Sequence, residues 1–275
     1  MIPLAVTGLV KRFPGFELAL DFELAPGYVT GLVGANGSGK TTLIKAALGA
    51  VIPDAGRVHL LPREHVGTVF DAVPYPRGWR VGMVARYVAG FHPGWDEQRF
   101  QKLCARWEIP LDARVKELSR GLGMRLQLAT ALSRDARLLI LDEPTAGLDP
   151  LVRDDLLETL AEHITDDRNT VLISTHITSD LEKIADYVAI LDGGRLIEHR
   201  AADELHATYR AVRGGALPDD SSALIGLRQH RSGWEALVRA EDAPRLGPGV
   251  VVERPTLEEI TIRLARRGLE ARKER

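Results

Sequence analysis

The sequence has 275 residues, enough to bury a full core and long for one domain, which favours a large domain with a small appendage. A formal net charge of −2 gives no field that would favour nucleic acid, and the single cysteine, Cys104, excludes a disulfide within the chain. No apolar run approaches the ~18–20 residues that span a bilayer, and no signal peptide is evident, so we expect a cytoplasmic protein whose membrane-spanning partner, if it has one, is another chain.

The first 30 residues alternate apolar and polar side chains. This alternation predicts antiparallel strands with a turn near Pro14-Gly15. Phe13 lies just before the turn, where it would either pack in the core or present a flat surface to a base such as adenine.

A glycine-rich loop, residues 34–42, lies between a buried strand predicted at 28–33 and a helix predicted at 41–48. The loop fits G-x-x-x-x-G-K-[ST], a phosphate-binding pattern. Its glycines let successive backbone N–H groups point at an anion, Lys40 can reach the β- and γ-phosphates, and the Thr41 hydroxyl can ligate Mg²⁺. The predicted nucleotide-binding residues are Gly34, Ala35, Asn36, Gly37, Ser38, Gly39, Lys40, Thr41 and Thr42.

A predominantly helical stretch follows two short strands, the second of which ends in Asp71. Helical periodicity over 74–118, continued by a helix at 122–132, predicts a helical layer over about 74–135, set into an α/β frame. Ser119 suits the N-cap of the later helix. Ser119 and Gly121 at this helix start could bind an anion through backbone N–H groups, although the pattern does not say whose phosphate they would bind.

Two carboxylates follow the all-apolar stretch Leu138-Leu139-Ile140-Leu141, which predicts a parallel strand buried on both faces. Ligands of open α/β sheets bind at the carboxyl ends of strands. Asp142 could therefore hold Mg²⁺ with Thr41, and Glu143 could act as general base on the attacking water; alternatively, both carboxylates cap the next turn. His176 ends the next buried strand at the same edge, where it could contact a γ-phosphate, although a lone histidine is more often structural.

The composition changes near residue 210. Glycines at 214–215 and a polar stretch at 218–222 read as a linker. Three short strands and a helix that starts with the capping box Thr256–Glu259 follow. We therefore divide the chain into a domain at 1–210 and a small C-terminal α/β extension at 211–275.

Taken in order, these motifs resemble those of the ATP-binding cassette (ABC) ATPases over residues 2–210. The glycine-rich loop is similar to the Walker A loop, 118–122 to the signature usually written LSGGQ, and 138–143 to Walker B with its catalytic glutamate. Residues 146–149 resemble the D-loop, His176 the switch histidine, and Phe13 the adenine-stacking aromatic. The resemblance implies an α/β P-loop NTPase core with an antiparallel β subdomain and an α-helical subdomain.

The resemblance also implies a mechanism and partners. ATP and Mg²⁺ would be bound between two cassettes arranged head to tail, the second being a copy or a close relative. Each ATP would lie between the glycine-rich loop of one subunit and the signature of the other. The helical subdomain would dock a membrane permease of the bacterial exporter type, which would hold the chain at the inner face of the membrane. The implied catalytic residues are Glu143, His176 and Lys40; the implied ATP contacts include Phe13, Ser119, Gly121 and Asp149; the implied Mg²⁺ ligands are Thr41, Asp142 and Asp71.

Three residues in two motifs depart from the family pattern. Asp71 occupies the place of the Q-loop glutamine; it can still reach Mg²⁺ through water but would repel a γ-phosphate at close range. Arg120 and Leu122 replace two residues of the usual signature, and Arg120 either adds charge near a partner's phosphate or faces solvent. A soluble ATPase acting on DNA or ribosomes, or a regulator that hydrolyses ATP poorly, is the alternative to a transporter subunit.

Overall fold

A six-stranded sheet in the order β5-β6-β7-β3-β8-β9 forms the centre of the computed structural model, which describes residues 1–247 and 249–273. Pairing is parallel throughout except for the edge strand β9, as the alternation of strands and helices predicted. The strands are β3 (Val29–Val33), β5 (Val66–Val69), β6 (Leu138–Asp142), β7 (Thr170–Thr175), β8 (Tyr187–Asp192) and β9 (Arg195–Ala201).

Strand β6 shows why the central strands are apolar at every position. Successive side chains point to opposite faces of the sheet. Leu139 and Leu141 therefore pack into one hydrophobic cluster, and Leu138 and Ile140 pack into another. All four are fully buried, so both faces of this strand are covered.

A three-stranded antiparallel sheet, β2-β1-β4, covers the sheet face that also carries helix α1 (Lys40–Ala47). Its strands are β1 (Leu4–Phe13), β2 (Phe16–Glu23) and β4 (Ala55–Leu60). The predicted turn at Pro14-Gly15 joins β1 and β2 and places Phe13 opposite Phe16. Phe13 therefore lies at the tip of a hairpin.

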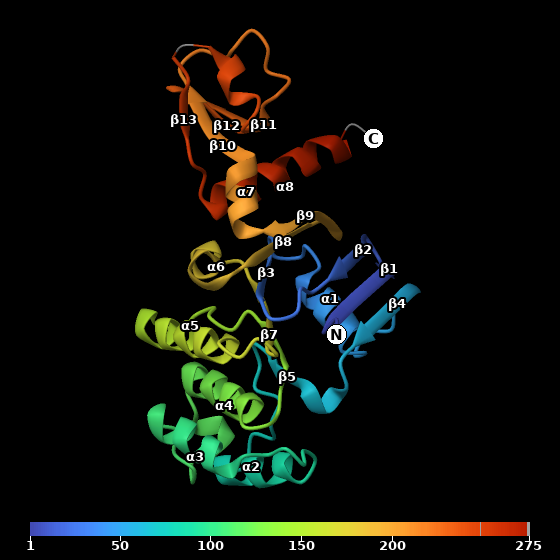
Figure 1. Cartoon of the computed structure of the whole chain (residues 1–275), viewed down its shortest axis with the longest axis vertical. Helices are drawn as coiled ribbons and strands as arrows, with labels where there is room; N and C mark the ends of the chain where they lie inside the picture. The colour runs from blue at the N-terminus through green and yellow to red at the C-terminus, as the bar shows by residue number, and fades with distance from the viewer. Residues whose placement is uncertain (248, 274–275) are drawn as a thin grey trace.

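Helices α2 to α5 and the shorter α6 pack on the other face. Their bounds are α2 (Val81–Ala89), α3 (Glu97–Arg106), α4 (Arg120–Leu132), α5 (Pro150–Ile164) and α6 (Thr178–Ile184), with short 3-10 turns at Arg63–His65 and Val115–Glu117. Phe100, Cys104 and Trp107 are buried, as their helical spacing predicted. Figure 1 shows α2, α3 and α4 together at one end of the molecule.

The C-terminal part lies at the opposite end (Figure 1). Helix α7 (Ala202–Thr208) leads to a four-stranded sheet, β11-β12-β10-β13. Its elements are β10 (Tyr209–Gly214), β11 (Ile225–His230), β12 (Gly233–Arg239), a 3-10 turn (Ala243–Leu246), β13 (Val251–Glu253) and α8 (Leu257–Lys273). The boundary predicted at residue 211 falls inside β10, whose pairing with β12 begins at Tyr209. The last two residues of the predicted extension lie outside the described part.

Helix α8 begins with the predicted capping box. The Thr256 backbone N–H donates to the Glu259 carboxylate at 2.8 Å, and the Glu259 N–H donates to the Thr256 hydroxyl at 3.2 Å. None of the helices in the described residues is both long enough and apolar enough to cross a bilayer.

Candidate functional site

The glycine-rich loop connects β3 to α1 through a backbone that other residues could not follow. A Cβ atom on Gly34 would lie 2.2 Å from the Leu191 carbonyl oxygen, and Gly39 has a φ of 112° immediately before α1. Lys40 starts the helix, and only 5% of it is exposed. Its Nζ donates to the Gly34 carbonyl at 2.7 Å, which folds the side chain back over the loop.

Glu143 is the acidic group that faces this lysine. Its Oε1 lies 3.3 Å from Lys40 Nζ. The residue follows β6 with a φ of 52°, a conformation that non-glycine residues rarely adopt and that is found at functional sites. Its backbone N–H donates to the Ser174 carbonyl at 3.0 Å, so β7 holds the turn in place.

His176 contacts the other carboxylate oxygen of Glu143. The distance from His176 Nδ1 to Glu143 Oε2 is 2.7 Å, and the His176 backbone N–H also donates to this oxygen at 3.3 Å. One carboxylate is thus held between a buried ammonium group and an imidazole. Such a carboxylate can accept a proton from water only from a fixed direction, which is the geometry that a general base needs.

Asp142 lies deeper, with 6% of its surface exposed. The Ser174 hydroxyl donates to its Oδ1 at 2.6 Å, which fixes the orientation of the carboxylate. The sequence predicted a buried strand before His176 but did not single out Ser174. Its polar side chain on an otherwise apolar strand next to β6 was the available signal.

Two cavities adjoin these side chains. The first, of about 490 Å³, lies between the hairpin tip and the loop; its lining includes Phe13, Phe16, residues 36–42 and Glu143. Phe13 is 41% exposed, and its ring centroid lies 6.3 Å from that of Phe16, another residue that the sequence analysis missed. An aromatic face at one end and backbone N–H groups at the other suit a base and a polyphosphate.

The second cavity, of about 550 Å³, shares Asn36, Thr41 and Glu143 with the first. It adds polar side chains from five separate segments of the chain: Lys45, Asp71, Arg120, Asp142 and His176. The structure thus brings every predicted catalytic and metal-ligating residue to one edge of the sheet, where β3, β5, β6 and β7 end.

These residues fit a magnesium ion that accompanies a nucleotide. Among the residues that the structure describes, no group of three or more His, Cys, Asp and Glu side chains is arranged to hold a metal ion. Mg²⁺ needs no such group, because it is usually held by one or two protein ligands together with phosphates and water. The hydroxyl of Thr41 and the carboxylate of Asp142 line the same cavity and supply that donor set.

Five predicted ATP contacts are absent from the lining of both cavities. Gly34 and Ala35 lie at the start of the glycine-rich loop itself, whereas Ser119, Gly121 and Asp149 lie outside that loop. Instead, the Ser119 hydroxyl caps α4 by accepting from the Leu122 N–H at 3.2 Å. Asp149 caps α5 in the same way, accepting from two backbone N–H groups at 3.1 Å each. Both side chains are exposed.

Comparison with known proteins agrees with this geometry. Residues 18–146 match the family model described as ABC transporter. The chain is 34% identical to Nod factor export ATP-binding protein I of Rhizobium etli, an alignment that covers 92% of this chain and 89% of that protein. The protein of the same name from Rhizobium sp. strain N33 is 31% identical, with 98% of this chain and 99% of that protein covered. A solved structure, described as the ATP binding subunit of an ABC transporter, is similar with a TM-score of 0.66 and 25% identity over 74% of this chain and 92% of that one.

Proposed function

The chain belongs to the ABC transporter family as an ATP-binding subunit, and from this membership we propose that it hydrolyses ATP to drive export through a separate membrane permease. The observation that carries the proposal is the group formed by Lys40, Glu143 and His176 beside the glycine-rich loop. Export is the activity for which the two Rhizobium relatives are named.

Each residue of the site takes a role that its position supports. Phe13 stacks on adenine, and residues 34–42 surround the phosphates. Thr41 and Asp142 hold Mg²⁺, which when bound neutralises charge on the phosphates. Phosphates entering the loop compete with Glu143 for Lys40. Glu143 then keeps His176 as its partner, orients the attacking water and accepts its proton, while His176 contacts the γ-phosphate.

A second cassette would complete the site. Ser119, Gly121 and Asp149 contact neither cavity of their own chain, yet Ser119 and Gly121 lie at a helix start, where backbone N–H groups favour an anion. In a head-to-tail pair, this helix start would face the partner's nucleotide. Two ATP molecules would then each be bound by residues of both chains.

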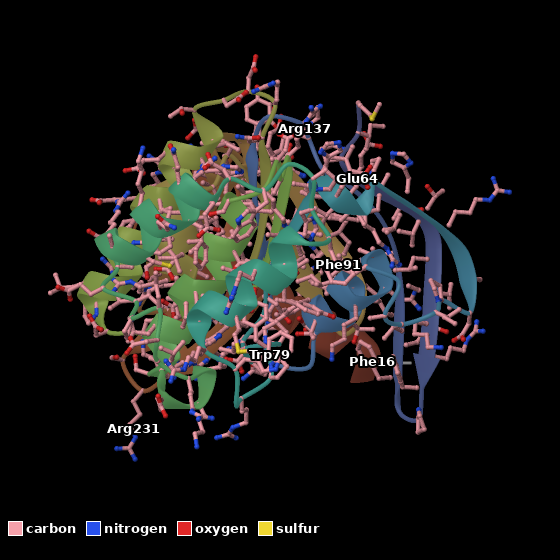
Figure 2. The ribbon with its side chains drawn as sticks, turned by 90° about the horizontal axis from the view of Figure 1, so that it is seen from below. Phe16, Glu64, Trp79, Phe91, Arg137 and Arg231 are labelled. Carbon is pink, nitrogen blue, oxygen red and sulfur yellow. The ribbon has the colours of Figure 1, made fainter. Side chains whose placement is uncertain are left out.

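A row of aromatic rings that runs from just before α2 to just after it supports docking to the permease; Trp79 is half-buried, and Tyr87 and Phe91 are exposed. The rings of Trp79 and Tyr87 have centroids 4.9 Å apart, and those of Tyr87 and Phe91 are 5.0 Å apart. Tyr87 is 55% exposed and Phe91 is 67% exposed. Figure 2 looks onto this end of the molecule, with Trp79 and Phe91 at the helices and Phe16 near the antiparallel strands. Contiguous exposed apolar groups mark interaction sites, so we place the permease on this row.

Photo-crosslinking tests this docking. A benzophenone amino acid at position 91 is introduced into the chain in its native cells, and crosslinked products are identified by mass spectrometry. We expect a multi-spanning membrane protein as the main product. The control is the same amino acid at Ile52, which is also exposed but lies outside the aromatic row. Soluble partners alone, or identical products from both positions, would contradict docking through α2.

A further inference from the structure

The loop that follows β5, residues 70–73, is held against one face of α4; we name it the Asp71 loop. Arg120, Gly123 and Gln127 are spaced by three and four residues, so they share that face. Gln127 is buried and clamps the loop backbone: its amide nitrogen donates to the Phe70 carbonyl at 2.9 Å, and its amide oxygen accepts from the Phe70 N–H at 3.0 Å.

Gly123, in the middle of this face, allows the Asp71 loop to approach α4 closely. A Cβ atom on Gly123 would lie 2.6 Å from a methyl carbon of Val73. A side chain here would push the loop away from the helix. The missing Cβ therefore permits the spacing at which the neighbouring contacts form.

The exposed end of the same face carries an ion pair. Arg120 hydrogen-bonds to Asp71 across the loop and the helix start. The Arg120 guanidinium also adjoins Gly147, since a Cβ atom built there would lie 3.2 Å from Arg120 Nη1. The two charged residues that depart from the family pattern are therefore partners of each other.

Both members of this pair line the second cavity, together with Asp142 and Glu143. An unpaired Asp71 would add a third negative charge to the wall of a cavity proposed to hold phosphates, and like charges repel across such distances. The side chains of Asp71 and Arg120 are 63% and 48% exposed. An ion pair of that exposure contributes little to the stability of the fold. We therefore expect its main effect to be on nucleotide affinity.

We propose that Arg120 is a positioning residue that compensates the charge of Asp71, so that the Asp71 loop and α4 act on the nucleotide as one unit. This inference rests on the proposed function, because it assumes that the cavity takes ATP. With its charge compensated, Asp71 repels the phosphates no more than a neutral side chain at its position would. The arginine has its role inside its own chain, while Ser119 and Gly121 next to it face outward.

A double-mutant cycle on nucleotide affinity tests the pair. Binding of a non-hydrolysable ATP analogue and of ADP, each with Mg²⁺, is titrated for the wild type, Arg120→Ala, Asp71→Asn and the double variant. We expect Arg120→Ala to weaken binding of the ATP analogue by about three- to ten-fold, because Asp71 loses its counter-charge. The effect on ADP should be smaller, since ADP carries less charge. Asp71→Asn in the Arg120→Ala background should restore the affinity to within about two-fold.

A matched pair in the extension provides the control. Arg213 and Glu253 form a cross-strand ion pair at 2.7 Å, with side chains 61% and 52% exposed. Their alanine variants should leave nucleotide affinity unchanged. Thermal unfolding of every variant checks that the fold is retained. Loss of affinity in Arg120→Ala that Asp71→Asn does not rescue, or no loss at all, would overturn the inference. A wild type that does not bind the ATP analogue would instead overturn the proposed function.

Discussion

Helices α1 and α4 both begin next to residues predicted to bind phosphate, but they begin in different surroundings. Lys40 at the start of α1 is buried and lines a cavity of its own chain. Ser119 and Gly121 at the start of α4 line neither cavity, and Ser119 uses its hydroxyl to cap its own helix. The phosphate site at the start of α1 is therefore formed within one chain, whereas the start of α4 lies outside both cavities of its own chain.

This difference indicates separate roles for the two helix starts in the proposed cassette. The charge of the buried Lys40 is not solvated by water. It therefore requires a negatively charged neighbour, either a bound ligand or Glu143. An exposed capped helix start is stable by itself. We infer that α1 determines whether ATP binds and that α4 determines whether the bound ATP is hydrolysed by a closed pair.

The largest effect is expected at α1. Replacing Lys40 with alanine removes the cation that reaches the phosphates and leaves Glu143 with His176 as its remaining partner. We expect ATP affinity to fall by about 100-fold or more, measured by titration with a fluorescent nucleotide. Lys102→Ala, at an exposed lysine on α3, is the control. Tight binding by Lys40→Ala would show that α1 is not the phosphate site.

Glu143→Gln should separate binding from hydrolysis. Glutamine keeps the shape of the side chain but cannot accept the proton of the attacking water. We expect ATP hydrolysis to fall by about 10²- to 10⁴-fold while binding is retained, measured by phosphate release. Glu108→Gln is a matched control, because Glu108 also has a φ of 52° but lies after α3. Equal rates for the two variants would remove Glu143 from the mechanism.

Ser119→Arg tests the start of α4. A bulky cation at this exposed position should prevent the second chain from closing over the nucleotide. We expect about 100-fold slower hydrolysis with unchanged nucleotide affinity of the separate chain. Ser221→Arg, in an exposed loop of the extension, should leave both quantities unchanged. A Ser119→Arg variant that loses affinity instead would place Ser119 in its own chain's site.

The smallest effect concerns stability. Gln127→Ala leaves the N–H and carbonyl groups of Phe70 without their partner on α4. We expect the free energy of unfolding to fall by about 1–3 kcal/mol, measured by urea denaturation. Gln101→Ala, at an exposed residue on α3, should change it by less than about 0.5 kcal/mol. Equal changes would mean that the clamp does not hold α4 to the Asp71 loop.

Features that depend on neighbours in the sequence could be predicted. The glycine-rich loop, the apolar strand β6 and the capping box of α8 each follow from residue types at fixed spacing. The meeting of Glu143 and His176 also followed, because parallel strands end at one edge of a sheet. The four adjacent apolar residues 138–141 were sufficient to identify β6 as a buried strand.

Features that depend on long-range register could not be predicted. Asp71 and Arg120 are 49 positions apart, and no local pattern shows that the loop and helix bring them together. The same holds for Ser174 and Asp142, which meet because β7 pairs with β6 in one register. The boundary predicted at residue 211 falls within β10, because that strand continues directly from α7 without a turn signal.

A crosslink between the glycine-rich loop of one chain and the start of α4 in the other tests most directly the claim that two chains share each nucleotide. Asn36→Cys and Ser119→Cys are placed in two differently tagged copies, both carrying Glu143→Gln, and mixed under mild oxidation. Burial raises the pKa of the native Cys104 thiol to about 12, so this thiol stays unreactive. We predict a disulfide between the two copies that forms with ATP and not without it. No ATP-dependent disulfide, or one equally abundant with Ser221→Cys in place of Ser119→Cys, would contradict the account.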